Sequence, residues 1–206
     1  VAARPEAGRE EGQCPVDGGR VNTVTFAAKM YWYIYSRYTF PFDMPTRLVK
    51  FSGSQIYVNN EYAKAQGLDP EEVVQSIETR LEAEPVVDKI WTRREIFEGT
   101  SKEAQLYRNS LVHDKSGDLM LQVHQGCLIG TDEGSQHGTP YWYDRHVPLI
   151  FYGWGVDSAR VDGPAHTIDI APTLARLIGL RIPVEVDGRP LPLDDGDSVA
   201  RLTGAP

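Results

Sequence analysis

The sequence predicts an α/β fold in which helices pack on a mixed β-sheet. Three observations favour this class. Segments with strand character alternate with amphipathic helical segments along the chain. The continuous apolar run at 147–152, VPLIFY, is typical of a central strand buried on both faces. The segment at 166–180, HTIDIAPTLARLIGL, has helical spacing of its apolar residues and a glycine where a helix would end.

Length and composition indicate one globular unit. The chain has 206 residues, of which 41% are hydrophobic, enough for one core of ordinary size. The formal net charge is −8 and the basic residues are dispersed, so we expect no nucleic-acid-binding surface. No run of about 18 apolar residues occurs, so no membrane span is predicted. The first residues, VAARPEAGREEG, contain no apolar stretch that could form a signal peptide.

The first 38 residues contain two different kinds of segment. Residues 1–22 are rich in Gly, Glu, Arg and Pro, and we expect a surface segment there. Residues 26–38 are strongly aromatic. Their tyrosines alternate as in a strand, whereas Phe26, Met30 and Tyr33 keep helical spacing. Periodicity therefore leaves a helix and a strand open for this segment.

The clearest helix lies at 68–85, LDPEEVVQSIETRLEAEP. Asp69 is placed to cap its N-terminus, Pro70 occupies the first helical position, and Pro85 ends it. Its apolar face consists of Val73, Val74, Ile77 and Leu81. Further along, the sequence predicts strands at 86–92 and 118–123 and a helix at 102–111.

The helix at 166–180 is expected to start near Asp169, which can act as its N-cap, so that Pro172 falls in the first turn. Gly179 then follows its C-terminus. The side that we expect to be buried carries Ile170, Leu174, Leu177 and Ile178.

Cys14 and Cys127 are the two cysteines of the chain. Their separation matches neither a zinc knuckle nor a disulfide framework. We expect two unpaired thiols, and one long-range disulfide is the alternative.

His137 is the candidate metal ligand among the five histidines. It stands between Gly134-Ser135-Gln136 and Gly138-Thr139-Pro140, in a polar loop just ahead of the apolar run. Such loops often carry ligands, and a neutral imidazole suits zinc. Taken alone, a loop histidine is more commonly a surface or hydrogen-bonding residue. His146, which directly precedes the run, is interpreted as structural.

Three ordered blocks carry a resemblance to a known family: HGTPYWYDRHVPLIFYGWG, HTIDIAPTLARLIGL and VDGRPL. They resemble the C-terminal end of alkaline phosphatase superfamily enzymes, especially the phosphate-irrepressible alkaline phosphatases related to type I phosphodiesterases and nucleotide pyrophosphatases. SGDLMLQVHQG resembles the strand before the His-Gly loop of these enzymes, and VNNEYAKAQGLDPEEVVQSI resembles their cap-like insert. The resemblance implies an alkaline-phosphatase-like mixed sheet with flanking helices, present as an incomplete C-terminal part.

The same resemblance implies a domain organisation. Residues 1–206 form a single C-terminal part of an alkaline-phosphatase-like domain. Within it, 1–22 is a surface segment and 23–115 a cap-like insert region. Residues 116–206 hold the C-terminal core strands and helix together with the His-Gly metal loop.

By resemblance, the complete enzyme is a zinc-dependent phosphatase or phosphodiesterase, a phosphoric ester hydrolase. It uses two zinc ions about 4 Å apart and forms a covalent phospho-enzyme on a Thr or Ser. His137 maps onto one metal ligand, and no residue of this chain maps onto a catalytic position. Upstream Asp-His-Gly and Asp-x-x-x-His motifs hold the other ligands. Asp-His-Gly does not occur here, and the Asp-x-x-x-His spacing occurs at Asp162–His166, after His137 rather than before it.

The chain is therefore expected to supply at most one zinc ligand, and it should be inactive alone because catalytic zinc needs three protein ligands. The expected partners are a phosphate ester substrate and the missing N-terminal half of the enzyme. The alternative is a natural, non-catalytic binding domain derived from the same fold. The retained metal-loop histidine favours a fragment of a longer enzyme. The resemblance also implies a periplasmic or secreted location.

Two neighbours of His137 are secondary candidates. Asp144 is expected either to accept a hydrogen bond from the second imidazole nitrogen of His137, or to cap backbone amides in a turn. Thr139 is a candidate for contact with the site.

Overall fold

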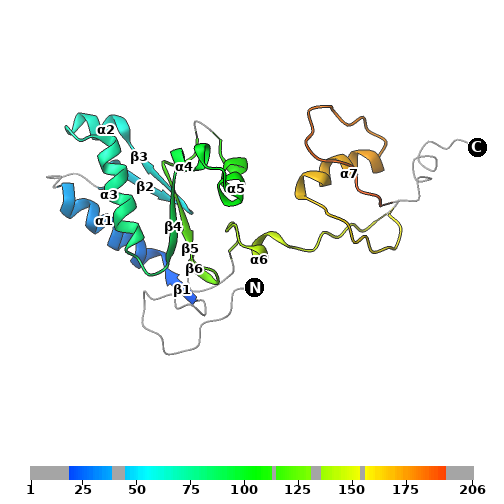
Figure 1. Cartoon of the computed structure of the whole chain (residues 1–206), viewed down its shortest axis with the longest axis horizontal. Coiled ribbons are helices and arrows are strands. Elements are labelled where there is room, and N and C mark those ends of the chain that lie inside the picture. Colours follow the sequence, from blue (N-terminus) through cyan, green and yellow to red (C-terminus); the bar gives the residue numbers. More distant parts are fainter. Residues whose placement is uncertain (1–18, 39–44, 113–114, 131–135, 154–155, 194–206) are drawn as a thin grey trace, which may run out of the picture. The chain divides into compact units, whose positions relative to one another are not determined.

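The computed structural model describes residues 19–38, 45–112, 115–130, 136–153 and 156–193. They form a mixed α/β fold with parallel and antiparallel strand pairs, as predicted (Figure 1). The chain divides into two compact units, Val1–His146 and Val147–Pro206, whereas the composition predicted one. The segment boundaries after residues 22 and 115, which rest on the resemblance, stay a prediction.

The first unit is built on a four-stranded antiparallel sheet with the order β2-β3-β5-β4. Its strands are β2 (Val49–Ser52), β3 (Gln55–Val58), β4 (Val87–Thr92) and β5 (Leu119–Val123). A separate parallel pair joins β1 (Gly19–Asn22) to β6 (Cys127–Gly130). The predictions of strands at 86–92 and 118–123 are confirmed by β4 and β5. β1 occupies the end of the segment expected at the surface, and its Val21 is buried.

The first unit has three layers (Figure 1). On one face of the sheet lie α1 (Thr23–Tyr38), the 3-10 helix η1 (Pro45–Arg47), α2 (Asn60–Ala65) and α3 (Pro70–Glu82). On the other face lie α4 (Arg93–Glu98) and α5 (Lys102–Ser110). Strand β5 is buried on both faces: Leu119 and Leu121 belong to the core under α1 and α3, and Met120 to the core under α4 and α5.

Helix α1 settles the alternative left open by periodicity. Phe26, Met30 and Ile34 are buried at intervals of four residues, as one face of a helix requires. The tyrosine hydroxyl of Tyr33 lies 2.8 Å from the side-chain oxygen of Ser76, which ties α1 to α3. The burial of these hydrophobic residues along one face therefore favours the helix over the strand.

Helix α3 confirms the prediction made from its capping residues. The Asp69 carboxylate accepts a hydrogen bond of 2.9 Å from the backbone N–H of Glu71, and Pro70 is the first helical residue. Val73, Ile77 and Leu81 are buried. Local sequence signals and tertiary packing agree along the whole of this helix.

The second unit contains the 3-10 helix η2 (Thr167–Asp169) and α7 (Ile170–Leu177). The predicted helix is confirmed, with Pro172 in its first turn and Gly179 at a φ of 69° just after it. The predicted burial is wrong in part, because Leu174 is 46% exposed and Ile178 is 61% exposed. Two of the four residues expected to be buried on this helix are therefore exposed in the described structure.

No strand forms at 147–152, so the prediction of a central buried strand is wrong for this chain. Ile150 is 81% exposed and Tyr152 is 100% exposed. A strand needs a neighbour that accepts and donates its backbone hydrogen bonds. Within the residues that the structure describes, no segment pairs with this run. Its composition suits burial, but the described chain supplies nothing to bury it.

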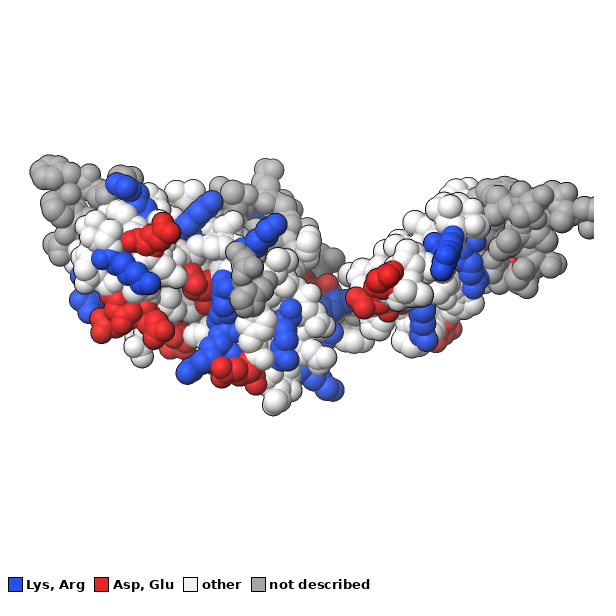
Figure 2. Space-filling view, turned by 90° about the horizontal axis from the view of Figure 1, so that it is seen from above, with Lys and Arg blue, Asp and Glu red and all other residues white. Residues whose placement is uncertain are grey.

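Three further expectations concern single features. Cys127 is disulfide-bonded, so the expectation of an unpaired thiol is wrong for it, and Cys14 lies outside the described residues. No helix in the described ranges is long and apolar enough to span a membrane. On the face drawn in Figure 2, the described basic side chains stand among acidic ones.

Asp169 ties the loop after α7 to the start of the helix. Its carboxylate accepts hydrogen bonds from the backbone N–H groups of Arg189 (2.9 Å) and His166 (2.8 Å), and its side chain does not cap α7. Asp169 is the N-cap residue of α7, as expected, but its side chain makes no capping hydrogen bond to this helix. Because these two N–H groups, first that of Arg189, stabilise the charged form, the pKa of Asp169 is lowered.

This lowered pKa predicts acid sensitivity of the second unit. A group with a lowered pKa in the folded state contributes stability above its unfolded pKa of about 4, and that stability is lost as pH falls further. We expect Asp169→Asn to speed amide exchange of His166 and Arg189 at neutral pH. It should also flatten the loss of stability below about pH 4. The matched control is Asp162→Asn, because Asp162 makes only an exposed ion pair with Arg160. Equal exchange in both variants would contradict the assignment.

Gly188 allows the loop that contains Arg189 to approach η2 closely. A Cβ at this position would stand 2.0 Å from the backbone oxygen of Ile168, which cannot move without displacing η2. We expect Gly188→Ala to destabilise the second unit by about 1–3 kcal/mol, as over-packing does. Gly163→Ala is the control, since a Cβ there meets nothing within 4 Å. Denaturant unfolding followed by hydrogen exchange checks this, and equal stability of both variants would show that the loop can retreat.

Candidate functional site

His137 lies on the wall of a pocket of about 730 Å³ in the first unit. Its apolar lining includes Phe26, Phe51 and Leu121. The loop and helix that follow β6 contribute the polar lining residues Gln136, His137, Thr139, Tyr143 and Asp144. His137 is exposed, and within the described residues its imidazole makes no hydrogen bond or ion pair. The imidazole is therefore available to a ligand that enters the pocket.

The loop is closed on itself by Asp144, which lies in the short helix α6 (Trp142–Arg145). The Asp144 carboxylate accepts hydrogen bonds from the backbone N–H of Thr139 (3.0 Å) and from the Thr139 hydroxyl. The guanidinium of Arg145 donates to the backbone oxygen of Pro140 at 2.7 Å. Residues 139–145 therefore form a compact turn.

The described contacts of Asp144 run to Thr139. Its hydrogen-bond donors in the described part of the chain both belong to Thr139, and none comes from His137. That pattern matches the turn-capping alternative. Thr139 lies on the pocket wall beside His137, so the structure brings the three predicted residues into one loop.

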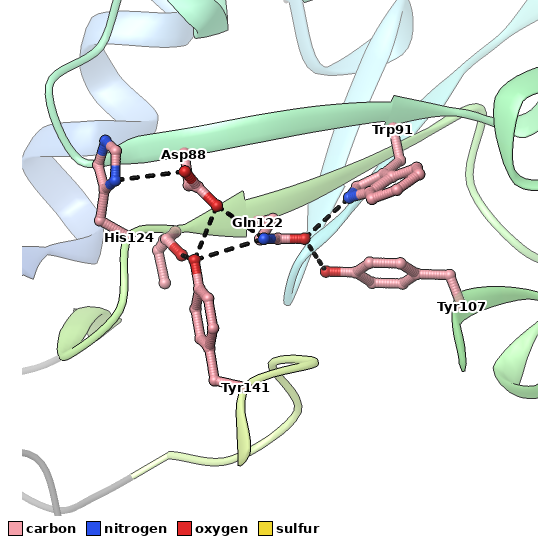
Figure 3. A network of polar contacts seen from close by, with 7 residues as sticks. Asp88, Trp91, Tyr107, Gln122, His124 and Tyr141 are labelled. Carbon is pink, nitrogen blue, oxygen red and sulfur yellow. Dashed lines mark hydrogen bonds and ion pairs between the residues drawn. The ribbon is translucent and has the colours of Figure 1, made fainter. Parts of the chain in front are cut away.

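The side chain of Tyr141 connects this turn to the sheet by hydrogen bonds (Figure 3). Its hydroxyl lies 2.8 Å from a carboxylate oxygen of Asp88 and 2.9 Å from the backbone oxygen of Val123. The side-chain amide of Gln122 donates to the same Asp88 oxygen at 2.7 Å and to the Tyr141 hydroxyl at 3.3 Å. The loop that carries His137 is thus joined to both β4 and β5.

Gln122 is the centre of this network and is only 6% exposed. Its amide oxygen accepts hydrogen bonds from the indole N–H of Trp91 (2.9 Å) and the hydroxyl of Tyr107 (3.1 Å). All three groups that the Gln122 amide offers are therefore paired, which removes the cost of burying them. Figure 3 shows the amide between Asp88 on one side and the two ring donors on the other.

The two tyrosine hydroxyls remain protonated at ordinary pH. Burial, together with the charge of Asp88, raises the pKa of Tyr141 to about 12. Burial, with smaller contributions from Tyr141 and Asp88, raises the pKa of Tyr107. Both groups therefore keep their donor protons, and the network holds over the neutral range.

A second tyrosine fixes the far side of the turn. The hydroxyl of Tyr143 accepts a hydrogen bond of 3.1 Å from the backbone N–H of Gly126, between β5 and β6. The rings of Tyr141 and Tyr143 are stacked, with centroids 5.9 Å apart. The sequence analysis assigned no role to Tyr141 or Tyr143. The polar Gln122 within the apolar strand DLMLQV was the signal that a buried amide needed partners.

Two other histidines of the first unit, His124 and His146, contact side chains other than His137. A ring nitrogen of His124 lies 3.4 Å from Asp88, and the ring of His146 stacks on Trp142 at 4.4 Å between centroids. His113 lies outside the described residues. No group of three or more His, Cys, Asp or Glu side chains that could hold a metal ion occurs in the described ranges.

Comparison with known proteins gives this loop and sheet a context. No family model matches the chain. The chain is 30% identical over 140 residues to alkaline phosphatase PafA of Elizabethkingia meningoseptica, covering 66% of this chain and 26% of that relative. It is 27% identical over 143 residues to a protein of Myroides odoratus named calcium-transporting ATPase, with the same shares covered. Further relatives are named alkaline phosphatases PhoK, PhoD and PhoV.

The fold comparison agrees with the sequence comparison. The crystal structure of wild-type alkaline phosphatase PafA superimposes with a TM-score of 0.69 at 24% identity, covering 85% of this chain and 34% of that chain. The chain spans about a quarter of the length of the curated relatives it matches, with 26% of the first two covered. Sequence and fold together support an alkaline-phosphatase-like superfamily for this chain.

Proposed function

We propose that this chain is the C-terminal portion of a zinc-dependent phosphatase or phosphodiesterase, in which His137 is a metal ligand. The observation that carries the proposal is the position of His137. Its imidazole is without a partner in the described residues, lies on the wall of a pocket of about 730 Å³, and is held in a loop anchored to the sheet. Relatives named alkaline phosphatases support the reaction class.

The residues present fit one part of a zinc site. A neutral imidazole is a common zinc ligand, whereas a catalytic zinc needs three protein ligands. The described ranges hold no group of three candidate ligands. In this proposal the chain contributes one ligand, His137, and the others come from the upstream part of the complete enzyme. The complete enzyme binds two zinc ions in this proposal.

In the proposed reaction, the hydroxyl of an upstream Thr or Ser attacks phosphorus, and the P–O bond to the leaving alcohol breaks. Water then hydrolyses the phospho-enzyme and releases phosphate. Bound zinc supplies charge stabilisation for the phosphoryl oxygens and the leaving group. This chain's part is to hold His137 at the pocket wall, with Asp144 and Thr139 fixing the turn beside it. The chain alone is then inactive, and the complete enzyme acts in the periplasm or outside the cell.

Replacement of His137 tests this function. In the complete enzyme, we expect His137→Ala to lower the bound zinc from two ions toward one and to reduce turnover by about 100-fold or more, because a catalytic metal supplies several kcal/mol. Metal analysis of the dialysed protein and steady-state hydrolysis of a phosphate monoester measure the two effects.

The matched control is His146→Ala. His146 is exposed and stacks on Trp142, so its loss should leave zinc content unchanged. Unchanged zinc and turnover in His137→Ala would sink the proposal. The coding sequence upstream of Val1 discriminates the alternative: an Asp-His-Gly motif and a nucleophile support the enzyme, and a start codon in their place supports a non-catalytic binding domain.

A further inference from the structure

Resting on the proposed function, we infer that Tyr141 is a positioning residue for the metal ligand His137: its hydroxyl, held between Asp88 and Gln122, sets the place of the loop that presents the imidazole to the pocket. Tyr141 touches neither substrate nor metal in this inference. It acts through the four-residue connection that runs from His137 to the sheet.

The loop needs such an anchor because its own backbone does not fix it. Residues 136–139 form no helix or strand, and Gly138 has a φ of 114°, a conformation that other residues rarely adopt. Helix α6 has four residues, too few to be stable by itself. The position of His137 must therefore come from tertiary contacts on either side of this loop.

Tyr141 is the first residue after His137 that bonds to the sheet. Its hydroxyl makes contacts to side chains from β4 and β5 and to the backbone oxygen of Val123. The Thr139–Asp144 hydrogen bonds close the turn that contains Tyr141. A displacement of the Tyr141 ring therefore moves the turn. His137 lies two residues before Thr139, the first residue of that turn.

The orientation of the Gln122 amide beside Tyr141 is fixed by its donors. Gln122 cannot turn its amide around, because its oxygen accepts from the indole N–H of Trp91, which can only donate, as well as from the Tyr107 hydroxyl. Its nitrogen must then face Asp88 and Tyr141. The Asp88 oxygen that accepts from Gln122 also accepts from the Tyr141 hydroxyl. The anchor is consequently rigid, as a group that orients a metal ligand has to be.

The test compares Tyr141→Phe with Tyr33→Phe in the complete enzyme. Each removes one hydroxyl from a partly buried ring, but Tyr33 bonds to Ser76 between α1 and α3, away from the loop. We expect both variants to lose a similar, small amount of stability. Only Tyr141→Phe should speed hydrogen–deuterium exchange in residues 136–146 and weaken zinc retention against a chelator by about 10- to 100-fold. Its kcat should recover in excess zinc, whereas that of His137→Ala should not.

A second pair of variants tests the same anchor without changing Tyr141. Asp88→Asn keeps an oxygen that can accept from Tyr141, and Asp88→Ala does not. We expect Asp88→Asn to retain zinc like the parent enzyme and Asp88→Ala to lose it like Tyr141→Phe. The same exchange and chelator measurements apply to both.

The outcomes separate this inference from the proposed function. If His137→Ala leaves zinc unchanged, the proposed function fails, whatever Tyr141→Phe does. If His137→Ala loses zinc but Tyr141→Phe retains it, the positioning role is overturned and the function stands. Faster exchange throughout the first unit of Tyr141→Phe, including α3, would also overturn it, because the hydroxyl would then serve general stability.

Discussion

The side-chain amide of Gln122 has to be paired wherever β5 places it, and that requirement organises the surroundings of the candidate site. β5 is the strand that both cores of the first unit share, so its side chains point into protein on either face. An unpaired amide there would cost about 1–3 kcal/mol for each polar group. Four groups remove that cost by pairing the amide: the indole N–H of Trp91, the hydroxyls of Tyr107 and Tyr141, and the Asp88 carboxylate. Because Tyr141 belongs to the loop of His137, the hydrogen bonds that pair the buried Gln122 amide also fix the position of this loop on the pocket wall.

The opposite situation, apolar surface without a partner, marks the second unit. Ile150 and Tyr152 come from the most strand-like run of the sequence, and both are exposed. Leu174 and Ile178 leave the apolar side of α7 half uncovered. Side chains of this kind gain about 25 cal/mol for each Å² of surface removed from water. A central strand needs neighbours on both of its edges, and no described segment pairs with the run at 147–152.

The candidate site divides in the same way between what sequence patterns indicate and what they miss. His137 stands out because a histidine between glycines precedes an apolar run and because the following blocks resemble a known family. Asp144 and Thr139 were suggested by proximity in the chain, and the structure pairs them with one another. Asp88, Gln122 and Tyr141 were not suggested. Their association joins residues 53 positions apart at its extremes, and no local pattern encodes which distant donor meets which acceptor.

What the sequence by itself determined is local. The Asp69 cap with Pro70 specified the start of α3, and Gly179 specified the end of α7, because these signals act within one turn of helix. Tertiary structure alone decided whether 26–38 forms a helix or a strand, whether 147–152 finds a strand to pair with, and where the His137 loop is fixed. Each of these depends on which surface or partner group lies opposite, and an isolated segment carries no information about that.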